Sequence, residues 1–86
     1  MKISVELTLT PLADAYAPAI KDFIMRLRSS SFDIPETPLS TQIYGEYDAL
    51  IPFLTQEIKT AFESEAGVLL HIKMFNTDRS QYVPNF

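Results

Sequence analysis

The opening residues carry the pattern that most restricts the fold of this chain. From Lys2 to Thr10, apolar and polar side chains alternate without interruption. The apolar set is Ile3, Val5, Leu7 and Leu9, and the polar set is Ser4, Glu6, Thr8 and Thr10. Strict alternation is typical of a β-strand that buries one side against a core and leaves the other side open. We therefore predict a half-buried strand, which Pro11 ends.

Two later stretches change to helical spacing. Pro18 suits the first turn of a helix, and the apolar residues that follow it recur every three or four positions until the Ser29–Ser31 break. These residues are Ile20, Phe23, Ile24 and Leu27. A second helix is predicted over 49–62, with Asp48 as its cap and Pro52 in its first turn. Its apolar stripe consists of Leu50, Leu54, Ile58, Ala61 and Phe62.

Three further segments are predicted to be strands. Residues 32–36 suit only the edge of a sheet, because Pro35 and Pro38 cannot donate a backbone hydrogen bond. Residues 40–46 alternate, and residues 68–75 are apolar on both sides. The remaining residues, 76–86, are polar and contain a proline, which indicates an irregular tail.

The order strand, helix, strand, strand, helix, strand predicts an α+β fold of the ferredoxin-like βαββαβ type. Such a fold has a four-stranded antiparallel sheet with both helices on one face. All 86 residues are expected to form one domain, with 76–86 as its C-terminal tail.

The other face of this sheet would be free of helices. By alternation it carries a mixture of polar, aliphatic and aromatic groups, namely Ser4, Glu6, Thr8, Gln42, Tyr44, Leu69, His71, Lys73 and Phe75. A sheet face of this kind is more often covered by a subunit or a ligand than left in water. We expect two copies to associate through it, as a homodimer or homotetramer, and to leave a polar cleft between them.

Composition excludes several classes of function. The chain has a formal charge of −4 and no cysteine, and its seven basic residues are scattered along the sequence. These properties argue against nucleic-acid binding, disulfides and zinc–thiolate sites. There is no apolar run that could span a bilayer and no recognisable secretory signal, so we expect a cytoplasmic protein without a membrane partner.

Several segments resemble the YkoF-like thiamine-binding family. The resemblance rests on the strand running into Thr10-Pro11-Leu12, the helix 16–28, Pro38-Leu39-Ser40-Thr41, Gly45-Glu46-Tyr47-Asp48, and the last strand through Phe75-Asn76. The family usually has Met-Ser-Thr where this chain has Leu39-Ser40-Thr41, a replacement that roughly conserves volume. The resemblance implies a ferredoxin-like domain that associates through its sheet and binds thiamine or its hydroxymethylpyrimidine part.

The resemblance also implies which residues would meet the ligand. Ser40, Thr41 and Gln42, with Thr8 beside them, would bind the pyrimidine edge. Tyr44 and Phe75 would stack on a ring, and Glu6 or Glu46 would face the thiazolium cation. His71 and Asn76 complete the candidate set. Gly45 is expected to allow a bulge or the close approach of a helix rather than to touch the ligand.

Each of these residues also has a purely structural interpretation. Ser40 and Thr41 can satisfy backbone groups where a strand begins, and Gln42 and Glu6 can be solvated or paired across a dimer. The two aromatic residues and His71 can pack in an interface between subunits. Asn76 can fix the exit of the last strand.

No catalytic or metal-binding motif is visible, and we expect neither an enzyme nor a bound cofactor. With two glycines and one histidine, the chain lacks a phosphate-cradling loop and a histidine-rich metal pattern. Two other hypotheses remain at this point. One is a structural or regulatory module whose helix-free face serves self-association alone. The other is a small phosphatase of the acylphosphatase type, although Arg26, Arg28 and Arg79 do not follow the first strand as that chemistry requires.

Overall fold

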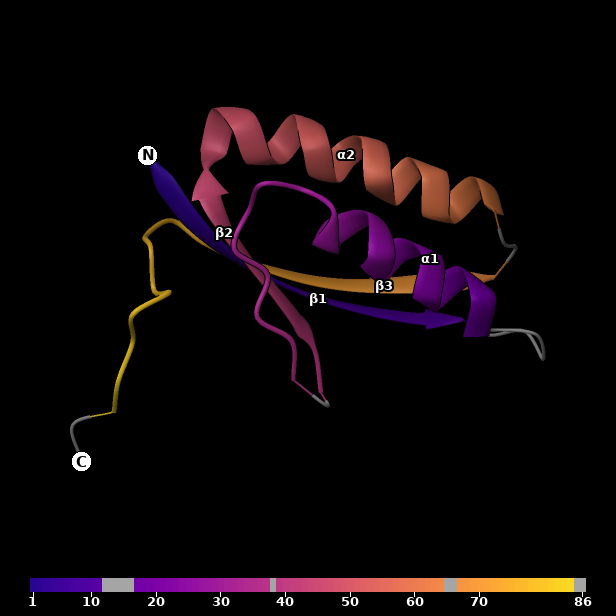
Figure 1. Ribbon diagram of the computed structural model, residues 1–86, viewed down its shortest axis with the longest axis horizontal. Helices are drawn as coiled ribbons and strands as arrows, with labels where there is room; N and C mark the ends of the chain where they lie inside the picture. The colour runs from indigo at the N-terminus through magenta and orange to yellow at the C-terminus, as the bar shows by residue number, and fades with distance from the viewer. Residues whose placement is uncertain (12–16, 38, 65–66, 85–86) are drawn as a thin grey trace.

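A three-stranded antiparallel sheet carries two helices on one of its faces (Figure 1). The elements are β1 (Lys2–Pro11), α1 (Ala17–Arg28), β2 (Thr41–Glu46), α2 (Tyr47–Ser64) and β3 (Val68–Phe75). The strand order is β2-β1-β3, so β1 is central. This computed structural model describes residues 1–11, 17–37, 39–64 and 67–84. Tyr16, Pro38 and the last two residues, on which some predictions rested, lie outside the described residues.

The structure shows three strands where four were expected. The segment predicted as an edge strand lies beside β2 but forms only two isolated bridges with it, Asp33 with Tyr44 and Glu36 with Thr41. Between them the amide of Gln42 donates to the carbonyl of Pro35 at 2.9 Å. Pro35 has no N–H with which to continue the ladder. The predicted edge position is therefore confirmed, whereas a continuous strand over 32–36 is not found.

The alternation in β1 and the helical stripes meet in one core, as predicted. Its buried members are Ile3, Val5, Leu7, Ile43, Phe23, Leu27, Leu50, Leu54 and Ala61. Phe62, a member of the predicted helical stripe, is half-exposed instead, at 48%. Ile72, which by alternation lies on the opposite face of β3 from Leu69 and Phe75, is also half-exposed, at 42%. Ile72 lies on β3, which pairs only with β1 among the described residues.

The second helix begins earlier than predicted. It starts at Tyr47, whose amide donates to the carbonyl of Met1 at 2.9 Å, so Asp48 lies inside the first turn rather than at the cap. A carboxylate there still faces the positive end of the helix dipole. Pro52 consequently lies beyond the first turn and lacks the N–H that would bond to the carbonyl of Asp48.

Gly45 allows the edge segment to pack closely on β2. A methyl group at this position would lie 2.7 Å from Cδ1 of Phe32. The centroid of the same ring lies 5.3 Å from the centroid of the Phe53 ring on α2. The absence of a side chain at Gly45 thus permits Phe32 to fill the space between β2 and α2. The close approach is made by this ring rather than by a helix, because Cβ of Leu50 on α2 would lie at an ordinary contact distance of 3.9 Å.

Replacing Gly45 with alanine should therefore destabilise the protein. We expect Gly45→Ala to lower the free energy of unfolding by about 1–3 kcal/mol, because the new methyl group overlaps the Phe32 ring. Urea unfolding followed by circular dichroism measures this. In a Phe32→Ala background the same substitution should cost less, as a double-mutant cycle would show. An equal cost in both backgrounds would contradict the explanation.

A bidentate ion pair attaches the edge segment to α1. The guanidinium of Arg28 contacts both carboxylate oxygens of Glu36, at 2.6 Å through Nε and 2.7 Å through Nη2. This hydrogen bonding to Arg28 lowers the pKa of the Glu36 carboxyl from its ordinary value of 4.5. The carboxylate is thus favoured more strongly in the folded than in the unfolded chain.

Stability should depend on pH through this pair. Because the folded-state pKa is lowered, the pair stabilises the fold above pH 4.5, and this contribution is lost as the pH falls through the lowered pKa. We expect Glu36→Gln to be less stable than the wild type at pH 7 and equally stable at strongly acidic pH, in urea unfolding. Glu63→Gln, which changes an exposed carboxylate of α2, is the matched control. A deficit of Glu36→Gln that persists in acid would disprove the assignment.

Candidate functional site

Two rows of side chains cross the helix-free face of the sheet. The antiparallel register places Tyr44, Ser4 and Phe75 in one row and Gln42, Glu6 and Lys73 in the next. Each row takes one residue from each strand, with β1 in the centre. Together with Arg79 from the C-terminal segment, these six residues line an open cleft of about 600 Å³. We call these seven residues the two-row site. Its volume falls in the range of small-molecule pockets.

Glu6 is the polar centre of the site. The Ser40 hydroxyl donates to its Oε2 at 3.0 Å, and the Lys73 ammonium lies 3.9 Å from its Oε1. The side chain of Glu6 remains 41% exposed, so its carboxylate can still accept hydrogen bonds from a ligand.

Tyr44 fixes the orientation of the amide beside it. Its hydroxyl donates to Oε1 of Gln42 at 2.8 Å, which leaves the amide NH₂ group as the donor available to a ligand. Partial burial raises the pKa of the Tyr44 phenol, and the carboxylates of Asp33, Asp78 and Glu6 raise it further. The phenol therefore stays protonated and keeps donating at neutral pH.

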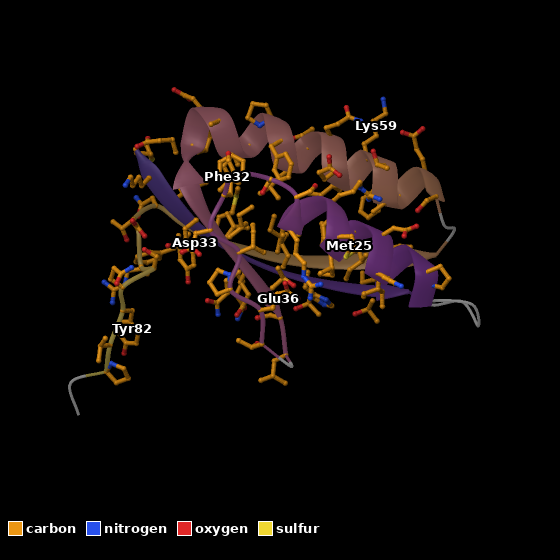
Figure 2. All side chains as sticks on the ribbon, in the orientation of Figure 1. Met25, Phe32, Asp33, Glu36, Lys59 and Tyr82 are labelled. Atoms are coloured by element: carbon orange, nitrogen blue, oxygen red, sulfur yellow. The ribbon has the colours of Figure 1, made fainter. Side chains whose placement is uncertain are left out.

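The segment after β3 forms one wall of the site. The Ser4 hydroxyl donates to the carbonyl of Thr77 at 2.7 Å and accepts from the amide of Arg79 at 2.8 Å. The Arg79 guanidinium lies over two aromatic rings. Its central carbon is 5.9 Å from the centroid of the Phe75 ring and 5.0 Å from the centroid of the Tyr82 ring. Figures 1 and 2 show this segment leaving the sheet on the side away from the helices, with Tyr82 along it.

A second, smaller cleft of about 200 Å³ lies at the other end of β1, between the sheet and α1. Among the residues that line it are Thr8, Ser40 and Thr41. Thr41 is paired with Leu7 and is only 7% exposed, on the face that carries the helices. The predicted ligand residues are thus divided. Glu6, Gln42, Tyr44 and Phe75 converge on the two-row site, whereas Thr41 lies on the opposite face from Gln42 and does not join it.

The remaining predicted residues lie outside both clefts. His71 is exposed opposite Thr8, and Asn76 is exposed just after β3. Glu46 pairs with the N-terminal amine of Met1 at 3.3 Å. Of the two carboxylates expected to face a cation, only Glu6 lines the cleft.

Sequence reasoning did not assign binding roles to Ser4, Lys73 or Arg79. The first two were recognisable as members of the helix-free face by alternation alone. Arg79 could not be placed, because it follows the last strand in a segment without periodicity, and its position depends on the hydrogen bonds to Ser4. The other two arginines pair with glutamates, Arg26 with Glu57 at 2.5 Å and Arg28 with Glu36.

The described residues contain neither a metal-binding cluster nor a membrane-spanning helix. Within these ranges, no group of three or more acidic or histidine side chains is arranged to hold a metal ion. No helix in the described part of the chain is long and apolar enough to cross a bilayer.

Comparison with solved structures shows that this fold recurs. A Streptococcus pneumoniae protein is 25% identical in sequence, with a TM-score of 0.82, and the match covers 91% of this chain and 89% of that one. A Thermotoga maritima protein, whose name assigns it provisionally to thiamine biosynthesis or salvage, is 13% identical, with a TM-score of 0.79. This match covers 99% of this chain and 91% of that one. A domain of unknown function, DUF77, from Bacillus cereus is 15% identical, with a TM-score of 0.73. This match covers 90% of this chain and 77% of that one.

At these identities the likenesses concern the fold alone, an α+β arrangement of two helices and an antiparallel sheet. Neither the family models nor the curated proteins gave a match to this sequence.

The hydrogen bonds of Ser4 make a prediction about the C-terminal segment. We expect Ser4→Ala to speed hydrogen exchange of the Arg79 amide, about tenfold for a loss of roughly 1.4 kcal/mol, since that amide loses its acceptor. Hydrogen exchange followed by NMR measures this. Thr10→Ala, on the same face of β1 and away from the cleft, should leave the rate unchanged. An unchanged rate in Ser4→Ala would show that the segment is held by other contacts.

Proposed function

We propose that this chain is a non-catalytic binding protein for thiamine or its hydroxymethylpyrimidine moiety, and that the ligand lies in the two-row site of a ferredoxin-like domain. The observation that carries the proposal is the convergence of an amide, a carboxylate and two aromatic rings on one cleft of suitable volume. The provisional link of a structurally similar Thermotoga maritima protein to thiamine metabolism supports the same ligand.

The chemistry of the site suits an aminopyrimidine. Such a ring needs a donor and an acceptor placed side by side at its edge, together with a surface on which to stack. The NH₂ group of Gln42 is a donor and the carboxylate of Glu6 is an acceptor, and the two residues are directly opposite each other on adjacent strands. Tyr44 and Phe75 supply aromatic surface at the two ends of the neighbouring row. Glu6 is also the carboxylate to which the thiazolium of thiamine would be drawn.

A second copy of the chain is proposed to cover the ligand. The two-row site is open, and Leu69 and Phe75 of β3 are 45% and 52% exposed on the same face. Apolar groups on a sheet face that no helix covers favour association. The proposed assembly is a homodimer or homotetramer with the ligand between sheets.

Calorimetric titration with thiamine and with free hydroxymethylpyrimidine tests the proposal. We expect saturable binding, weakened about tenfold in Gln42→Ala, because one hydrogen bond of about 1.4 kcal/mol is lost. Gln56→Ala, which removes an exposed amide from α2, is the matched control and should bind as the wild type does. Absence of heat with both ligands at millimolar concentration would defeat the proposal.

The exposed apolar groups also favour a second candidate function, that of a self-associating structural or regulatory module. In that case Phe75→Ser should reduce the oligomer size measured by light scattering, while neither ligand binds to any variant. Binding of either ligand to the wild type would decide against this candidate.

A further inference from the structure

The two-row site has a local charge opposite to that of the whole chain. The charged residues that line it are one carboxylate, Glu6, and two cations, Lys73 and Arg79. The carboxylates of Asp33 and Asp78 act on the nearby Tyr44 phenol but do not line the cleft. The formal charge of the complete sequence is −4. A cleft with more cations than carboxylates, in an otherwise acidic protein, favours a ligand that brings negative charge with it.

Neither cation is fully neutralised by the protein. The Lys73 ammonium lies 3.9 Å from Glu6, at the outer limit of an ion pair, and its side chain is 86% exposed. The other oxygen of Glu6 is already bonded to Ser40. Arg79 forms no ion pair with any carboxylate in the described ranges, in contrast to the two arginines of α1, each of which contacts a glutamate.

Arg79 is nevertheless held in place. Its backbone amide is bonded to Ser4, and its guanidinium lies over two aromatic rings. A guanidinium is planar, and its N–H donors lie in its own plane. These donors match the oxygens of a phosphate, to which arginine can bind in a bidentate manner.

We propose that the site binds a phosphate monoester of a flat, amine-bearing heterocycle in preference to the unphosphorylated compound. The phosphate lies between Lys73 and Arg79, and the ring lies against Phe75 with its edge toward Glu6 and Gln42. This inference rests on the proposed function and specifies the chemical class of its ligand.

The spacing along β3 is compatible with this arrangement. Lys73 and Phe75 are two residues apart on one face, which is about 6.6–6.8 Å in a strand. Arg79 lies over the Phe75 ring. A phosphate joined to a stacked ring by a single methylene group can therefore reach both cations. The cleft of about 600 Å³ accommodates a ring together with this substituent.

Titration with a matched pair of ligands tests the inference. The probes are hydroxymethylpyrimidine, its monophosphate, in which one methylene group joins the ring and the phosphate, and inorganic phosphate alone. We expect the monophosphate to bind at least about tenfold more tightly than its parent at low ionic strength, and this advantage to shrink as salt screens the cations. Lys73→Gln and Arg79→Gln should abolish most of the advantage of the monophosphate over its parent.

Lys59→Gln is the matched control, because it removes an equal charge from the exposed side of α2 (Figure 2). This variant should retain the full preference for the monophosphate. Circular dichroism and the urea midpoint confirm that each variant is folded before titration.

The outcomes separate this inference from the proposed function. Equal affinity for a parent and its monophosphate, unchanged in both cleft variants, would overturn the phosphate preference and leave the proposed function standing. No binding of any heterocycle would overturn both. Inorganic phosphate that binds as tightly as the monoester would show that the ring contributes nothing, and this result too would overturn the inference.

Discussion

The pairing of β1 with strands on both of its sides is the constraint on which the rest of the structure depends. Because side chains alternate along a strand, one register places the apolar residues of β1 under the helices and its polar residues on the open face. A shift of one residue would exchange the two sets and expose Val5 and Leu7. The same pairing that forms the core therefore also assembles Ser4 and Glu6 with their neighbours into the two-row site.

Much of this arrangement could be predicted from periodicity. Both helices, β1, β3 and nearly all of the core follow from the spacing of apolar residues, and the helix-free face follows from the alternate positions of the same strands. The edge segment is different. Its prolines predict a position at the edge of the sheet. The extent of its pairing with β2, however, depends on the few backbone N–H groups that remain and on the fit of the Phe32 ring over Gly45.

The candidate site was less predictable than the fold. Residues in regular strands, such as Gln42 and Tyr44, could be assigned to a face, and the structure brings them together. Thr41 was grouped with its sequence neighbours, although adjacent residues of a strand point to opposite faces. Arg79 lies in an aperiodic segment. The contacts of Ser4 with the backbone at Thr77 and Arg79, together with the position of the guanidinium over the Phe75 ring, place it beside the cleft.

The two margins of the sheet differ in their capacity to accept another strand. On the β2 side, the proline-containing segment already occupies the margin and offers few further donors. On the β3 side, Val68–Phe75 contains no proline and pairs only with β1 among the described residues. Any lateral growth of the sheet is thus directional. It would proceed outward from β3, parallel to the plane of the layer, and leave the polar rows across its open surface unobstructed.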